Sequence, residues 1–263
     1  MSVYKNGLVL SGGGARGIAH IGVLQALEDH DIQVDAISGC SAGAIVGVLY
    51  AAGCSPSKIT NYIKNKSLYG IIKMGIPSRG MMEMPYFREI LEKEIPHNSF
   101  DELKTPFYLS VTNLNTGTCE VKHEGGNLID YVIASSTIPM VFKPIKIGRD
   151  LYVDGGIVNN LPVDPLLGKC ERLIGVNVNT VEYVKDVSGL TDVGIRCLDI
   201  SMKEQVQSNL KLCDMAIEPK VSHFGMFSLS KPMDIFNAGY SEATSVILAS
   251  RTNQISHGTS ASR

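Results

Sequence analysis

Residues 35–49 read Asp-Ala-Ile-Ser-Gly-Cys-Ser-Ala-Gly-Ala-Ile-Val-Gly-Val-Leu, and this stretch decides the fold. Its centre, Gly39-Cys-Ser-Ala-Gly43, fits the pattern G-x-S-x-G, in which a strand turns sharply into a helix and the serine is strained and exposed. The flanking residues predict a strand over 35–38 and a buried helix from Ser41 to about Ala52, ended by Gly53 and Pro56. Ser41 is therefore the candidate nucleophile; the alternative is an ordinary helix start capped by this serine.

A glycine-rich loop comes shortly before this stretch. Gly12-Gly-Gly-Ala-Arg-Gly17 lies between a predicted strand over 7–11 and a predicted helix over 18–30. Several backbone N–H groups of such a loop can point into the crevice at the carboxyl edge of the sheet and hold an oxyanion there. Losing one such donor typically raises the barrier of acyl transfer by about 2.7 to 4 kcal/mol. Arg16 either aids the developing charge or braces the loop.

The same six residues also satisfy G-x-G-x-x-G, the spacing of dinucleotide-binding loops. A nucleotide site requires an acidic residue at the far end of the second strand, but Asp35 begins that strand and Ser41 ends it. A P-loop is excluded, because Ile18 and Ala19 stand where Lys and Ser/Thr are needed. A dinucleotide-binding protein using residues 12–17 stays open as an alternative function.

A carboxylate follows a later predicted strand. Asp154 begins Asp154-Gly-Gly156 after the apolar segment 151–153, so its side chain lies at a strand end beside backbone with little steric bulk. From there it can reach Ser41. The alternative is a plain Asp-Gly turn, which is common.

The remaining sequence continues the alternation of strands and helices. An α/β protein with a three-layer α/β/α architecture and a mostly parallel central sheet is expected. Residues 1–251 are expected to form a single domain, and the Ser/Thr/Gly-rich residues 252–263 a flexible tail. Further strands are predicted over 107–113, 118–122, 151–154, 173–178 and 215–218, and further helices over 86–95, 128–135, 192–212 and 240–250.

Composition excludes several classes of protein. The formal net charge is −2 and the pI about 6.3, which gives no broad attraction for nucleic acid or an anionic membrane, so no nucleic-acid partner is expected. The six cysteines are scattered without zinc spacing, and no acidic cluster suited to calcium is apparent, so neither metal nor cofactor is expected. With no apolar leader before residue 7, the expected location is cytoplasmic, peripheral at a membrane where lipid is contacted.

Residues 68–86 interrupt the regular alternation and hold four of the ten methionines. Flexible thioethers adapt to varied acyl chains, and Lys73 and Arg79 can meet phosphate, so this segment is a candidate interfacial lid with transient membrane-surface contact. The alternative is ordinary core packing.

Together the glycine loop, the G-x-S-x-G serine and the Asp-Gly-Gly sequence resemble the patatin-like phospholipase family, all three being present in the family's order. The resemblance extends from about Gly7 to Pro165 and includes Ile138-Pro-Met-Val-Phe-Lys-Pro144 and Asn159-Asn-Leu-Pro162. It implies a patatin-like fold and a serine lipid acyl hydrolase, of phospholipase A, lysophospholipase or esterase type, acting on phospholipids or other fatty acyl esters. Beyond Asn179 the resemblance rests on little more than length.

The resemblance also implies roles for individual residues. Ser41 and Asp154 would form a catalytic dyad in which Asp154 takes the serine proton, the acyl-serine forms, and water releases it. Gly12, Gly13, Gly14 and Arg16 would line the oxyanion hole. A carboxylate acting as the base without a histidine requires a raised pKa.

Three alternatives to the dyad enzyme remain. An α/β-hydrolase triad can be assembled from Ser41, Asp154 and His223, in the order that this class uses. His223 lies in a loop-like segment, where an exposed histidine is unremarkable, and Cys40 beside the nucleophile is interpreted as packing. The others are the dinucleotide-binding protein and a catalytically silent scaffold.

Overall fold

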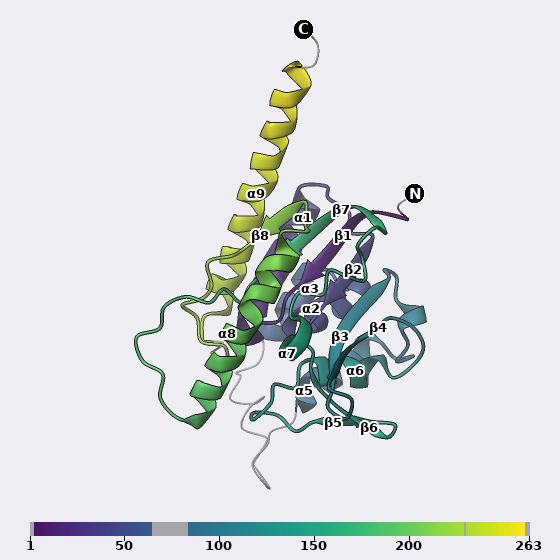
Figure 1. The fold of residues 1–263 in the computed structure, drawn as a ribbon. Coiled ribbons are helices and arrows are strands. Elements are labelled where there is room, and N and C mark those ends of the chain that lie inside the picture. Colours follow the sequence, from purple (N-terminus) through teal and green to yellow (C-terminus); the bar gives the residue numbers. More distant parts are fainter. Residues whose placement is uncertain (1–2, 65–83, 229, 261–263) are drawn as a thin grey trace.

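The structure is a computed structural model that describes residues 3–64, 84–228 and 230–260. Figure 1 shows a central sheet with helices on both faces and a long C-terminal helix that extends past the sheet. The sheet has eight strands in the order β5-β6-β3-β2-β1-β7-β8, with β4 paired to β3. The α/β class and the mostly parallel sheet predicted from the sequence are confirmed.

The parallel part of the sheet runs from β3 to β8. Strands β4, β5 and β6 add antiparallel pairings at the other end, where β6 pairs with β3 and β5 with β6. The strands are β1 (Tyr4–Leu10), β2 (Ala36–Gly39), β3 (Phe107–Asn113), β4 (Thr118–Lys122), β5 (Ile145–Ile147), β6 (Asp150–Asp154), β7 (Cys170–Val176) and β8 (Met215–Ile217).

Strand β1 lies between β2, which follows it in the chain, and β7, which comes much later. This is a topological switch point, where ligands of open α/β sheets bind outside the carboxyl ends of the strands. Leu10, the last residue of β1, pairs with Gly39, the last residue of β2. The glycine loop and Ser41 therefore leave the same edge of the sheet side by side.

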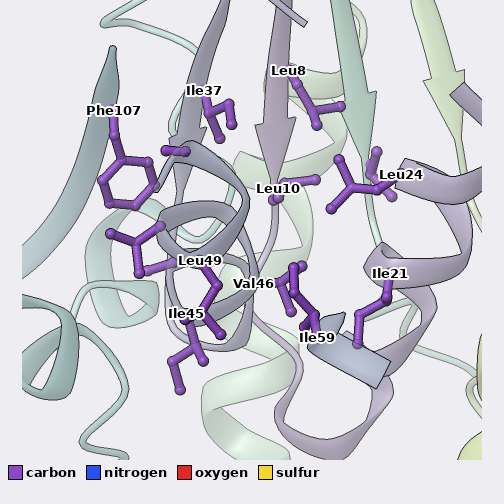
Figure 2. Close-up of a cluster of buried hydrophobic side chains, with 14 of the residues drawn as sticks. Leu8, Leu10, Ile21, Leu24, Ile37, Ile45, Val46, Leu49, Ile59 and Phe107 are labelled. Carbon is purple, nitrogen blue, oxygen red and sulfur yellow. The ribbon is translucent and has the colours of Figure 1, made fainter. Parts of the chain in front are cut away.

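Two separate hydrophobic clusters show that both faces of the sheet are covered. Leu8 and Leu10 belong to the larger cluster, whereas Val9 between them belongs to the smaller one, as side-chain alternation along a strand requires. Figure 2 shows part of the larger cluster, where Leu8 and Leu10 of β1 face apolar side chains from the helices. Val206 and Leu210 of α8 belong to the smaller cluster.

The helices cover the two faces of the sheet. Helices α1, α2, α3 and α9 contribute to the larger cluster, and α8 contributes to the smaller one. The helices are α1 (Ile18–Asp29), α2 (Ala42–Ala51), α3 (Pro56–Lys64), α5 (Pro85–Glu94), α6 (Leu128–Ser135), α7 (Gly156–Asn159), α8 (Leu190–Leu210) and α9 (Pro232–Ser260), with short 3-10 turns η1 (Gly14–Gly17) and η2 (Phe100–Glu102).

Several elements differ from those predicted, among them α7, which has no counterpart in the sequence prediction. Pro56 was expected to end a helix, but it begins α3, because proline is well suited to a first helical turn. Strand β5 was not predicted. Helix α9 is longer than the predicted 240–250 and covers most of the stretch expected to fray. The division into a domain over 1–251 and a flexible tail over 252–263 stays a prediction.

Candidate active site

Ser41 adopts the strained conformation that its motif predicts. It has φ 52° and ψ −122°, between the end of β2 and the start of α2. Its side chain is buried, with 5% of its surface exposed, and not exposed as the motif predicts. The flanking glycines permit this turn: a Cβ on Gly39 would lie 2.7 Å from the carbonyl oxygen of Gly43, and one on Gly43 would lie 2.4 Å from that of Leu10. Positive φ costs about 1 to 3 kcal/mol in a residue other than glycine and persists only where surrounding structure enforces it.

Asp154 is in direct contact with this serine. Ser41 Oγ donates a hydrogen bond to Asp154 Oδ2 at 2.7 Å, and no third group lies between them. The other carboxylate oxygen, Oδ1, accepts a hydrogen bond from Gly156 N–H at 2.8 Å and a weak one from Cys40 Sγ at 3.7 Å. The thiol of Cys40, interpreted from the sequence as packing, therefore also touches the carboxylate.

Burial raises the pKa of Asp154 from 3.8 to about 6, because the ionised carboxylate loses its hydration inside the protein. The hydrogen bonds from Ser41, Gly156 and Cys40 act in the opposite direction and favour the ionised form. The resulting value is that of a base which is ionised at neutral pH and still accepts a proton readily. Ser41 and Asp154 are thus chemically suited to proton transfer without a histidine.

The glycine loop lies beside the serine with free backbone donors. Within the described residues, the N–H groups of Gly13 and Gly14 have no hydrogen-bond partner, whereas Gly12 N–H is bound to Asn160. Glycine is needed here for space: a Cβ on Gly12 would lie 3.0 Å from Ser41 Cβ, and Gly14 has φ +58°. Gly13 and Gly14 are the loop members whose N–H groups can meet an oxyanion.

Arg16 braces the loop instead of facing the serine. Its guanidinium donates hydrogen bonds to the carbonyl oxygens of Phe224 and Ser222 and to Asn179 Oδ1. Of the two roles expected for this side chain, the structure shows the bracing one. The segment it holds passes over the glycine loop, where Ala15 N–H donates to Met226 O at 2.7 Å.

The described residues form neither of two alternative sites, the Ser-Asp-His triad and the dinucleotide site. His223 is exposed and packs against Phe224 with ring centroids 4.0 Å apart and the ring planes tilted, while Ser41 Oγ donates directly to Asp154, so a Ser-Asp-His triad is not assembled. Asp35 accepts a hydrogen bond from Asn6 N–H at the start of β2, at the opposite end of the strand from the glycine loop. It does not occupy the position of a ribose-binding acid.

Two cavities meet at Ser41. The first is open, has a volume of about 140 Å³, and is lined mainly by apolar side chains, from α2, α3 and α5 and from Ile138, Phe142, Met226 and Phe227. The second, of about 40 Å³, lies on the side of Asp154; Asn160, Asn179 and Asp199 lie in its wall among more numerous apolar side chains. Ser41 borders both cavities, whereas Asp154 borders only the second.

Several residues around this site were not anticipated from the sequence. Ser135 Oγ accepts a hydrogen bond from Ser41 N–H at 2.9 Å and donates one to Ser110 O, which fixes the backbone of Ser41. Asn160 binds the glycine loop across the site. Isolated serines and asparagines carry no sequence signal for such contacts, although Asn160 does lie within a segment that resembles the family.

Other predicted features lie partly outside the structure. Most of the candidate lid over 68–86, including Lys73 and Arg79, lies outside the described residues; Met84 and Tyr86, at its end, border the apolar cavity. Among the described residues there is no group of three or more His, Cys, Asp or Glu side chains placed to hold a metal ion. None of the described helices combines the length and apolar character needed to cross a bilayer.

A doubly wound sheet with a strained serine and a buried carboxylate at its carboxyl edge defines the class as α/β serine hydrolases. The chain belongs to the patatin-like phospholipase family, because the family model described as Patatin-like phospholipase matches residues 8–167.

Similarity to individual proteins agrees with this family. Lysophospholipase NTE1 of Cryptococcus neoformans is 36% identical over 200 residues, which cover 70% of this chain and 12% of that protein. Patatin-like phospholipase domain-containing protein 6 of Homo sapiens is 34% identical over 165 residues, which cover 60% of this chain and 12% of that protein. The chain thus spans a small part of the length of the curated relatives it matches.

Among solved structures, VipD from Legionella pneumophila is similar with a TM-score of 0.53 and 15% identity. The similarity covers 94% of this chain and 67% of that chain. At this level of identity, the similarity supports the fold and not a shared substrate.

Proposed function

We propose that this chain is a serine lipid acyl hydrolase that cleaves carboxylic ester bonds of fatty acyl lipids with Ser41 and Asp154 as its catalytic dyad. The observation that carries this proposal is the direct 2.7 Å hydrogen bond from Ser41 Oγ to Asp154 Oδ2, at the mouth of an apolar cavity. No other pair of groups is needed to make the serine nucleophilic.

The reaction follows from the contacts of the dyad. Ser41 Oγ attacks the ester carbonyl while its proton passes to Asp154, and the N–H groups of Gly13 and Gly14 stabilise the oxyanion. Asp154 then gives the proton to the leaving alcohol, which departs and leaves an acyl-serine. A water molecule gives a proton to Asp154 and attacks the acyl carbon. Ser41 takes that proton back as the carboxylic acid is released.

A fatty acyl chain is the substrate that the cavity fits best. Its walls are apolar and it begins at Ser41, so a chain lying in it places the ester carbonyl at the nucleophile. The names of the relatives, lysophospholipase and patatin-like phospholipase, point to the same bond class. Phospholipase A, lysophospholipase and general esterase activity all remain within this proposal.

Location and lipid contact are further parts of the proposal. All six cysteines are free thiols, which fits a reducing compartment such as the cytoplasm. Transient contact with a membrane surface through residues 68–86 stays a prediction, as does the absence of a nucleic-acid partner. Co-sedimentation of the wild-type protein with lipid vesicles, and of a variant with Lys73 and Arg79 changed to Gln, tests that contact.

The hydrolysis of p-nitrophenyl esters over a range of acyl lengths tests the function. Ser41→Ala and Asp154→Asn are expected to lose activity, whereas His223→Gln retains it because this histidine is exposed and does not touch the dyad. A fluorophosphonate probe should label Ser41 in the wild type only. Undiminished rates in Ser41→Ala would reject the hydrolase, and inactive but folded His223→Gln would replace the dyad with a triad.

A further inference from the structure

Asn160 is a buried polar residue at the candidate active site, and only one of its two side-chain hydrogen-bonding groups has a partner among the described residues. It follows α7, is 3% exposed, and its Oδ1 accepts a hydrogen bond from Gly12 N–H at 3.2 Å. Its Nδ2 is buried and has no hydrogen-bond partner among the residues that the structure describes. The orientation of the amide is fixed, because turning it over would direct two N–H donors at each other.

The side-chain amide of Asn160 has the glycine loop on one side and Asp154 on another. A Cβ on Gly12 would lie 2.4 Å from Asn160 Oδ1 and 3.0 Å from Ser41 Cβ. A Cβ on Gly156 would lie 2.7 Å from Asn160 Oδ1 and 3.0 Å from Asp154 Oδ1. Asn160 Oδ1 thus lies near both members of the dyad, and Asn160 lines the smaller cavity that Ser41 and Asp154 also border.

An unpartnered buried donor is costly, about 1 to 3 kcal/mol, and native proteins rarely leave one unused. The smaller cavity is the one that Asp154 borders, and Asp154 is the group that delivers the proton to the departing oxygen. The alcohol part of the ester must therefore lie on this side of Ser41, with the acyl chain on the other. Its departing oxygen is the acceptor available to Asn160 Nδ2.

We propose that the smaller cavity receives the alcohol portion of the ester and that Asn160 Nδ2 donates a hydrogen bond to its departing oxygen. This rests on the proposed function. As the bond between the acyl carbon and this oxygen breaks, negative charge develops on the oxygen. The Asn160 donor stabilises that charge until the proton from Asp154 arrives and the neutral alcohol leaves.

The test compares two esters of one acyl group. A monoacylglycerol has a poorly leaving alkoxide that needs this hydrogen bond, whereas a p-nitrophenyl ester departs as a stable phenolate that does not. In Asn160→Ala, kcat/KM should fall about 10- to 100-fold for the glycerol ester, the usual effect of losing a hydrogen bond to a charged group. For the p-nitrophenyl ester it should change by about threefold at most.

A second variant separates this role from a structural one. Asn160→Asp keeps the size and the Oδ1 acceptor for Gly12 but removes the N–H donor, so it should show the same selective loss at a pH above the acid limb of its rate profile. Gly12 N–H also bonds the backbone oxygen of Asn160, which no side-chain variant removes. Asn159→Ala is the matched control, because its side chain faces Asp164 and Gln205 outside both cavities.

Equal loss for both esters, or no loss in Asn160→Asp, would overturn the proposal. The rate of fluorophosphonate labelling of Ser41 should stay near the wild-type rate in both Asn160 variants, and its loss would assign Asn160 a structural role instead. Failure of the proposed function itself is distinguishable, since the wild type would then neither be labelled nor hydrolyse either ester.

Discussion

Burial makes the ionised form of Asp154 less stable and so raises its pKa. The raised pKa sets how activity depends on pH. Because burial raises its pKa to about 6, the carboxylate is protonated below that pH and cannot accept the proton of Ser41. We therefore expect kcat/KM to rise with pH through about 6 and to level off above it. If kcat/KM stays constant down to pH 4 and falls only below it, the raised pKa is contradicted.

The same shift has a consequence for stability. A carboxyl group whose pKa is higher in the folded protein stabilises the fold only while protonated, and this contribution is lost as pH rises through about 6. Asp154→Asn cannot ionise, so its free energy of unfolding relative to wild type should increase by about 1.4 kcal/mol between pH 5 and pH 8. Urea denaturation at both pH values measures this. Asp186→Asn, at an exposed position, serves as the control.

Cys40 tunes this carboxylate through its contact with Oδ1. The thiol donates to the ionised form at 3.7 Å and lowers the pKa of Asp154, so its removal raises that pKa. In Cys40→Ala the acid limb of the kcat/KM profile should move to higher pH while the plateau is kept. Cys54→Ala, buried but outside the dyad, is the control. An unmoved limb would mean that the thiol only fills space.

At the scale of single residues, sequence and structure differ in an instructive way. Ser41 and Asp154 could be predicted because glycines, which carry a strong local signal, surround both. The bracing role of Arg16 could not, because its partners lie more than 160 positions away in the chain. Asn160 and Ser135 are likewise recognised only when distant segments are brought together.

Secondary structure elements show a similar division. Strands β1, β2 and β3 are apolar runs with clear turns, and the sequence predicts them. Strand β5 has three residues and depends on pairing with β6, so it has no strong signal of its own. The sequence does not predict helix α3, because a proline after a glycine indicates the end of a helix; in the structure Ser55 Oγ accepts a hydrogen bond from Lys58 N–H as a helix cap does.

The contact between α1 and α9 depends on two glycines. A Cβ on Gly239 would lie 2.0 Å from Ala19 O, and one on Gly22 would lie 2.1 Å from Phe236 O. Gly239→Ala should therefore lower the free energy of unfolding by about 1 to 3 kcal/mol, because the helices must separate, even though alanine favours helix by about 1 kcal/mol. Ser241→Ala, exposed on the same helix, is the control for propensity. A neutral or stabilising Gly239→Ala, measured by urea denaturation, would contradict this close approach.

At the scale of the whole molecule, the division of the site into two cavities follows from the layers. Helix α2 starts next to Ser41 and runs away from it along the apolar cavity, with Ile45 about 6 Å and Leu49 about 12 Å along the helix axis from Ser41. Figure 2 shows both side chains on this helix, within the cluster that covers the sheet. An acyl chain that follows the cavity meets Ile45 first and Leu49 later.

This order predicts how the cavity selects chain length. Ile45→Phe should lower kcat/KM for esters of all but the shortest acyl groups, whereas Leu49→Phe should affect only long ones, because the added ring fills the cavity farther from Ser41. The measurement is kcat/KM over a series of p-nitrophenyl esters, with thermal unfolding to show that each variant is folded. Val48→Leu, buried on α2 but outside the cavity, is the control. If both phenylalanine variants lower kcat/KM equally for all acyl lengths, the acyl chain does not lie along α2. The apolar cavity would then not determine the specificity of this protein for acyl length.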